Sequence, residues 1–213
     1  ETAGYDLAAL GAAADQVRLC MPKTPQDYAP GGAAEQLVMW ATAQVNRYKL
    51  YPVFSTLSQN GQQYVTMDEI VETLGSLNAG EANLTDNMMV TPGTAFNFQL
   101  GEGGTLQDDP ATGATRLEMA DATYWLGTPT WLRSRLDLVS RYNIGGVVVQ
   151  NLLSEGNFPG MHTVLQNFQT GAPAAPQSTL DVVWEITSPA GEVETSETSL
   201  AQPQLAWSAP DVT

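Results

Sequence analysis

The stretch from Trp125 to Leu153 constrains the fold more than any other part of the sequence. Thr128 can cap a helix whose first residue, Pro129, has no backbone N–H to leave unpaired and a φ angle suited to a helix. The polar side of this helix carries Arg133, Ser134, Asp137, Ser140 and Arg141, and Asp137 is placed to pair with Arg141. The other side is broadly apolar and carries Trp131, Leu132, Leu136, Leu138, Val139 and Tyr142. The pattern predicts a half-buried helix.

A buried strand is expected directly after this helix, over residues 145–151. Asn143 and the pair Gly145-Gly146 tolerate the left-handed conformations that often end a helix. Val147, Val148 and Val149 then follow without polar alternation, as in a strand that is covered on both faces. Helix, turn and doubly covered strand together are typical of a parallel α/β sheet.

This unit resembles the last helix–strand unit of family 18 glycoside hydrolases, which are chitinase-like (β/α)8 barrels. The resemblance is carried by the tryptophan-led helix, by Tyr142-Asn143 with the glycine pair, and by the apolar strand. Upstream, Tyr5 to Gly11 and Asp15 to Met21 resemble the segment that enters the sixth strand of that family, and residues 49–55 resemble its seventh strand. The resemblance covers residues 3–166.

The fold class expected from these features is α/β, with a partial (β/α)8 TIM-type barrel that supplies the last strands and helices. Residues 1–168 are assigned to the barrel portion, 169–177 to an Ala/Pro linker, and 178–213 to an incomplete immunoglobulin-like β-sandwich. Three parallel strands cannot close a barrel of eight. We therefore expect another polypeptide, or a larger assembly, to complete the barrel.

The expected elements follow from periodicity and turn residues. In the barrel portion they are helices at 5–14, 33–46, 66–74 and 159–168 and strands at 16–21 and 50–57. An antiparallel insertion is expected between residues 78 and 123, with strands at 88–90, 94–100 and 115–119. The sandwich strands are expected at 180–186 and 191–200, with a third beginning at 205–207.

Charge and rare residues exclude several classes of function. The chain has 23 Asp and Glu against 8 Lys and Arg, a formal charge of −15, so nucleic acid is excluded as a partner. No run approaches the ~20 apolar residues of a membrane span. Cys20, the only cysteine, lies in an apolar run and is expected to be a small core residue. With His162 as the only histidine, neither a metal site nor another cofactor is expected.

The catalytic motif of the resembled family, DxxDxE, is absent from the chain, so no catalytic residue is assigned. The paired acids Asp68-Glu69 and Asp108-Asp109 fit a helix's first turn and a loop turn. Where the family's sixth strand ends in Met-x-Tyr-Asp, this chain has Cys20-Met21-Pro22-Lys23. Where the eighth strand ends in a sugar-stacking tryptophan, it has Gln150.

Five residues are candidates for lining a ligand site. Lys23, Ser55 and Gln150 follow or end predicted strands, and the alternative is that they are ordinary polar residues at strand ends. Tyr28 and Trp125, with Tyr124, are expected on loops or near loop ends, where they could stack on sugar rings, and the alternative is packing in the core or anchoring of a loop. The side chain of Gln150 is expected to face the strand ends and to bond Lys23 or a loop carbonyl.

Together these features favour a secreted or cell-surface, non-catalytic glycosidase-like module that serves as a structural scaffold or a glycan-binding element. The alternative is a glycoside hydrolase acting on chitin or on peptidoglycan-like N-acetylated glycans, with its acidic motif encoded upstream of Glu1. The expected ligand in either case is a polysaccharide or a peptidoglycan-like glycan.

Overall fold

The computed structural model describes residues 6–75, 77–78, 93–101, 104–173, 180–188 and 191–210. The chain forms two compact units. The first comprises Glu1–Met67, Gln107–Arg116 and Thr123–Gln177, and the second Asp68–Leu106, Leu117–Ala122 and Ser178–Thr213. The domain boundaries expected from the sequence stay predictions.

A parallel three-stranded sheet lies at the centre of the first unit. Its strands are β1 (Val17–Cys20), β2 (Leu50–Ser55) and β10 (Val148–Gln150), in the order β1-β2-β10. Both pairings are parallel, and the register places Gln150 beside Ser55. The prediction of three parallel strands from these segments is confirmed.

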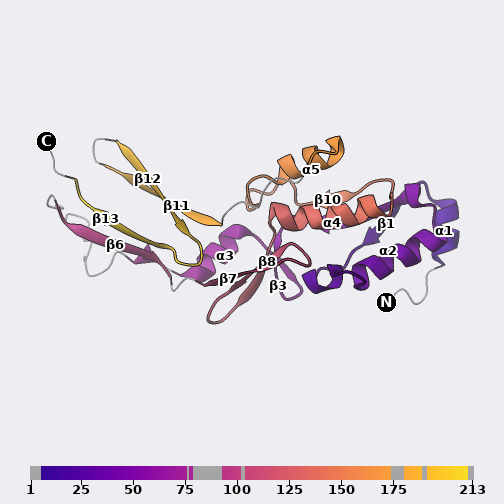
Figure 1. Cartoon of the computed structure of the whole chain (residues 1–213), viewed down its shortest axis with the longest axis horizontal. Coiled ribbons are helices and arrows are strands. Elements are labelled where there is room, and N and C mark those ends of the chain that lie inside the picture. The colour runs from indigo at the N-terminus through magenta and orange to yellow at the C-terminus, as the bar shows by residue number, and fades with distance from the viewer. Residues whose placement is uncertain are drawn as a thin grey trace. The chain divides into compact units, whose positions relative to one another are not determined.

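Four helices accompany this sheet, α1 (Leu7–Ala13), α2 (Ala33–Gln44), α4 (Pro129–Arg141) and α5 (Met161–Thr170) (Figure 1). Short 3-10 turns, η1 (Pro25–Tyr28) and η2 (Arg47–Lys49), precede α2 and β2. The four helices agree with the predicted segments. Within the described residues, no helix has the length and apolarity that crossing a bilayer requires.

The helices pack against one face of the sheet. This core joins α1, α2 and α4 to the three strands through Leu7, Leu19, Val38, Ala41, Leu50, Phe54, Leu138 and Val139. A second apolar cluster joins α4 to α5 through Leu132, Leu136, Met161 and Val164. Burial of these side chains is the main favourable contribution to the stability of the unit.

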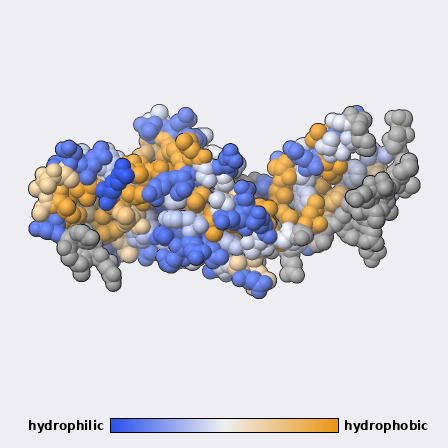
Figure 2. Space-filling model, turned by 180° about the vertical axis from the view of Figure 1, so that it is seen from behind, coloured by the Kyte–Doolittle hydropathy of each residue, from blue (hydrophilic) through white to orange (hydrophobic). Residues whose placement is uncertain are grey.

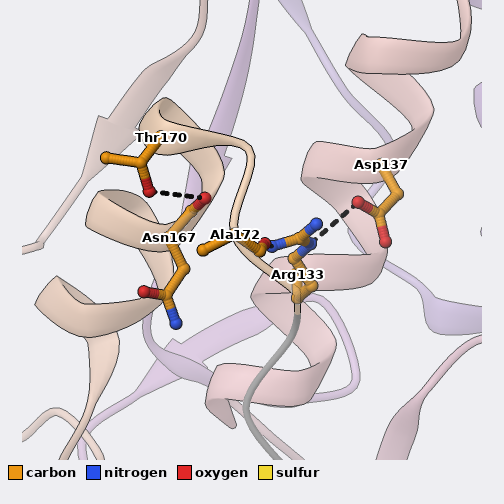
Figure 3. Close-up of polar contacts among 5 residues, drawn as sticks. All are labelled: Arg133, Asp137, Asn167, Thr170 and Ala172. Carbon is orange, nitrogen blue, oxygen red and sulfur yellow. Dashed lines mark hydrogen bonds and ion pairs between the residues drawn. The ribbon is translucent and has the colours of Figure 1, made fainter.

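Helix α4 begins as the sequence predicts, because the Thr128 hydroxyl accepts a hydrogen bond from the backbone N–H of Trp131 at 3.2 Å. Its predicted ion pair is wrong. Asp137 pairs with Arg133 at 2.8 Å and not with Arg141. Arg133 also donates to the carbonyl of Ala172, beyond the end of α5, at 3.1 Å (Figure 3). This second bond holds the guanidinium on the Asp137 side of the helix.

The turn after α4 differs in detail from the prediction. Asn143 adopts a left-handed conformation with φ of 50°, as expected, but Gly145 and Gly146 do not. A Cβ at Gly145 would lie 2.3 Å from the carbonyl oxygen of Tyr48, and one at Gly146 would lie 2.6 Å from the ring of Tyr51. The two glycines are therefore needed for close packing of this turn against the start of β2.

The sheet face opposite the helices is partly open. Leu19 is buried against the helices, whereas Cys20 is exposed, so the prediction of a core cysteine is wrong. Neighbouring residues of a strand point to opposite faces, and only one face of β1 packs on the helices. On the side of the molecule drawn in Figure 2, hydrophobic residues remain at the surface of this unit.

A second sheet is formed by β3 (Ser58–Asn60), β4 (Gln63–Val65), β7 (Thr105–Asp109), β8 (Ala114–Glu118) and β9 (Thr123–Leu126), in the order β4-β3-β9-β8-β7. The β3–β4 and β3–β9 pairings are antiparallel. Helix α3 (Met67–Leu74) lies where the sequence predicts it. Of the strands expected in the insertion, those at 94–100 and 115–119 are confirmed as β6 (Ala95–Leu100) and β8, while the strand expected at 88–90 lies outside the described residues.

In the second unit, β11 (Asp181–Thr187) and β12 (Val193–Ser199) form an antiparallel hairpin. The next strand, β13 (Gln204–Ser208), pairs with β6 (Ala95–Leu100), which in turn pairs with β5 (Leu77–Asn78). The ring of Phe96 lies 5.8 Å from that of Trp207. The third predicted sandwich strand therefore pairs with the insertion, because aromatic residues of β6 are available to it.

The carboxylate of Glu35 connects α2 to the end of α4. It accepts hydrogen bonds from the Gly31 backbone N–H and the Tyr142 hydroxyl, each at 2.7 Å, and pairs with Arg141 at 3.1 Å. These donors hold the pKa of Glu35 below its usual value of 4.5, and the hydrogen bond from Gly31 has the largest effect.

A lowered pKa means that Glu35 stabilises the fold above pH 4.5 and that this contribution is lost as the pH falls through the folded-state pKa. We therefore expect the Glu35→Gln variant to be less stable than the wild type at neutral pH, with the difference shrinking between about pH 5 and about pH 3. Urea denaturation of both proteins across this pH range measures the difference in stability. The control is Glu155→Gln, which removes an exposed carboxylate. A constant difference for Glu35→Gln would contradict the assignment.

Candidate functional site

The C-terminal ends of β2 and β10 are joined by polar contacts. Ser55 is 1% exposed, and its hydroxyl donates to Oδ1 of Asn151 at 3.1 Å. The backbone N–H and the hydroxyl of Thr56 both donate to the carbonyl of Gln150, at 3.2 and 3.3 Å. Ser55 and Gln150, two of the candidates, are thus brought together as neighbours on adjacent strands. The hydroxyl of Ser55 is already used within the protein.

A residue that the sequence reasoning missed, Arg135, lies beneath this strand end. Its side chain is 3% exposed. Its Nη1 donates to the carbonyl of Ser55 at 2.9 Å, and its Nε donates to the carbonyl of Trp131 at 3.4 Å. The guanidinium lies 4.7 Å from the ring centroid of Trp131 and 5.5 Å from that of Phe54.

Arg135 is a buried cation whose interactions in the described part of the chain are with neutral groups. Its Nη2 has no hydrogen-bond partner there. Burial lowers the pKa of the guanidinium to about 10, so it stays protonated at neutral pH. Aromatic faces and carbonyl dipoles replace the usual carboxylate, an arrangement that the flat and weakly hydrated guanidinium tolerates better than an ammonium group does.

A sequence signal for Arg135 did exist. It follows Trp131 by four residues and precedes Val139 by four, which places it within the apolar face of α4. An arginine at such a position has to bury its guanidinium or extend it past the apolar contacts to an edge.

Tyr28 belongs to the same aromatic cluster. Its ring meets Trp131 edge to face at 4.9 Å, and its hydroxyl donates to the carbonyl of Pro22 at 2.7 Å. Burial raises the pKa of the Tyr28 phenol. The contacts are those of a packed aromatic residue with its polar end satisfied.

Lys23 follows β1 and is engaged as well. Its ammonium donates to the carbonyl of Gln62 at 3.0 Å and lies 4.6 Å from the ring centroid of Tyr64. Partial burial is the main cause of a raised pKa of the Tyr64 phenol. Lys23 thus attaches the loop after β1 to the turn between β3 and β4.

The two remaining candidates are Gln150 and Trp125. Gln150 is exposed, and Lys23, one of its two expected partners, bonds Gln62 instead. Trp125 is the next-to-last residue of strand β9, half-buried and paired with Gln59, and the Arg116 guanidinium lies 5.8 Å from its ring. Tyr124, beside it, is buried. Trp125 therefore lies in a different sheet from Ser55 and Gln150.

The C-terminal ends of the parallel strands carry hydroxyl, amide and ammonium groups but no carboxyl group in the residues directly after them. Residues 21–24, 56–59 and 151–154, which follow β1, β2 and β10, contain no Asp or Glu. In the described ranges there is also no group of three His, Cys, Asp or Glu side chains that could hold a metal ion. Such an arrangement can donate hydrogen bonds to a polar ligand but supplies no general acid at these positions.

No protein-family model matches the chain, and no curated protein matches it in sequence. Solved structures do resemble it. A class V chitinase from Pseudomonas fluorescens matches with a TM-score of 0.50 at 16% identity, over 78% of this chain and 51% of that one. A chitinase from Chromobacterium violaceum matches with a TM-score of 0.49 at 18% identity, over 78% and 49%. The spore cortex-lytic enzyme SleL of Bacillus megaterium matches with a TM-score of 0.48 at 11% identity, over 82% and 38%.

The chain is therefore a mixed α/β protein with a chitinase-like fold. It spans about half the length of the two chitinases, and at 16% identity the similarity to the Pseudomonas fluorescens enzyme concerns the fold and not the activity. The three parallel strands with their helices agree with the barrel resemblance noted in the sequence.

Replacement of Arg135 tests its role at the strand end. We expect Arg135→Lys to lower the free energy of unfolding by about 1–3 kcal/mol, because the ammonium cannot stack on two rings and also reach the Ser55 carbonyl. Arg135→Met should cost less than Arg135→Lys, since it removes the charge that has no counter-ion. Urea denaturation of both variants gives the comparison.

Arg141→Lys in the same helix is the matched control. The Arg141 side chain is 58% exposed, and the substitution should change stability by less than about 0.5 kcal/mol. Equal losses for Arg135→Lys and Arg141→Lys would show that the buried guanidinium has no special role.

Proposed function

We propose that the chain is part of a non-catalytic, glycosidase-like module that serves as a structural scaffold or a glycan-binding element. The observation that carries the proposal is the internal use of the polar groups at the strand ends. Ser55 bonds Asn151, Lys23 bonds Gln62, and Tyr28 bonds the carbonyl of Pro22. A substrate would have to displace these contacts, each of which contributes about 0.5–1.5 kcal/mol to stability.

The lack of acidic residues at the strand ends supports the same proposal. Most glycoside hydrolases use two carboxyl groups that flank the scissile bond. The four residues directly after each of β1, β2 and β10 include no Asp or Glu, and the DxxDxE motif does not occur in the chain. The position of the expected sugar-stacking tryptophan is held by Gln150, whose amide offers no ring face.

A second candidate function is a glycoside hydrolase acting on chitin or on peptidoglycan-like N-acetylated glycans. The observation that favours it is the structural similarity to a chitinase of which the match covers only 51%. In this alternative the acidic motif is encoded upstream of Glu1, and the present residues contribute only the far side of the barrel.

Both candidate functions require further strands to complete the parallel sheet. In the order β1-β2-β10, the strands β1 and β10 each have one edge without a partner strand in that described sheet. Open edges of parallel strands attract further strands, and a barrel needs more than three. We propose that another polypeptide, or another part of the same gene product, supplies them.

We also propose that the module acts outside the cell or at its surface, and that residues 178–213 belong to an immunoglobulin-like sandwich. The alternation of exposed and half-buried residues along β11 supports a sandwich strand with one covered face. The extracellular setting rests on the resemblance to family 18 glycoside hydrolases noted in the sequence.

The test uses the longest product of the gene, incubated with colloidal chitin and with purified peptidoglycan. We expect no release of reducing sugars, because the strand ends lack acids and are closed by internal hydrogen bonds. The coding sequence before Glu1 is read at the same time for a DxxDxE motif. Release of sugars that disappears when the last Glu of such a motif is changed to Gln would establish the hydrolase and refute the non-catalytic proposal.

A further inference from the structure

A cavity of about 450 Å³ lies at the end of the parallel sheet opposite Ser55. It is formed where α2 runs into η2 ahead of β2 and where α4 ends ahead of β10. Its lining residues are Thr42, Val45, Asn46, Arg47, Arg141 and Tyr142. None of these residues takes part in the contacts at the C-terminal strand ends.

The charge of this cavity contrasts with that of the chain. Two of the 8 basic residues line it, in a protein with 23 acidic ones. The guanidinium of Arg47 is exposed and lies 5.9 Å from the ring centroid of Tyr48. It makes no ion pair or hydrogen bond with another described side chain. Arg47 therefore keeps its full capacity to donate hydrogen bonds.

The guanidinium of Arg141 also has N–H donors that are not used by Glu35. It uses Nη1 to bond Glu35, whose carboxylate is shared with Gly31 and Tyr142. A guanidinium carries five N–H donors in a planar fork, so most of those on Arg141 remain available. Glu35 therefore occupies only Nη1 of Arg141.

The amide of Asn46 adds to the set of donors. Its Oδ1 accepts from the backbone N–H of Tyr48 at 3.1 Å, which leaves the amide NH2 to other partners. Two guanidinium groups and an amide NH2 favour a ligand with several acceptor oxygens and a negative charge. The net negative charge of the protein opposes this only weakly, since at physiological salt such fields are screened over about 8 Å.

We propose that this cavity binds a sugar-sized molecule that carries one carboxylate or one phosphate group. Guanidinium groups pair bidentately with either anion. Ligand sites typically enclose roughly 300–1,000 Å³, so the volume suits a monosaccharide derivative better than a bare inorganic ion. The proposal is independent of whether the C-terminal strand ends bind or cleave glycans.

The test is calorimetric titration of the full chain with three probes of similar size, namely glucuronate, glucose 6-phosphate and uncharged glucose. At least one of the charged sugars should saturate a single site, while glucose should not bind. Comparison of the two charged sugars tells whether carboxylate or phosphate is preferred. Failure of both, or equal binding of glucose, would overturn the proposal.

Variants link the binding to the cavity. Arg47→Gln should weaken binding of the preferred sugar by about tenfold without a change in melting temperature, because it removes one charge-assisted contact from an exposed side chain. The matched control is Arg18→Gln, which removes an exposed arginine of β1 outside the cavity and should leave the affinity unchanged. Unchanged affinity in Arg47→Gln, or an equal loss in Arg18→Gln, would show that the cavity is not the site.

Discussion

The guanidinium of Arg135 is the constraint on which the C-terminal end of the parallel sheet depends. It ties helix α4 to the last carbonyl of β2 at 2.9 Å, and the next residue, Thr56, bonds the end of β10. A charge placed among Trp131, Phe54 and two carbonyls is stable only when those groups surround it closely. The need to solvate one buried cation therefore fixes how helix, central strand and neighbouring strand meet.

The second organising feature is the parallel sheet, because helices cover only one of its two faces. Parallel sheets are usually covered on both faces. Here the helices bury Leu50 and Phe54 on one face, while Cys20 and Gln150 remain exposed on the other. The register of the strands places Cys20 level with Val53, and Gln150 level with Ser55, on this second face.

Local signals in the sequence predicted the helices and strands well, whereas contacts between distant elements could not be predicted from them. Thr128, Pro129 and the apolar spacing after them placed α4 correctly, since a helix start depends on residues within one turn. The burial of Arg135, the exposure of Cys20 and the pairing of β13 with β6 depend on what lies opposite in space. For the candidate site, Ser55 and Gln150 end their strands as predicted, whereas the bond from Ser55 to Asn151 was not foreseen.

The order of the strands also bears on how the chain folds. β1 and β2 are separated by little more than helix α2 and its turns, so they can pair soon after α2 forms. The bond between Thr56 and Gln150 instead joins residues 94 positions apart, across the whole insertion. Closing a longer loop costs more chain entropy, and such contacts tend to form late. We therefore expect the β1–α2–β2 segment to form first and β10 to be added last, and we expect the length of the insertion to affect the folding rate more than the stability of the finished sheet.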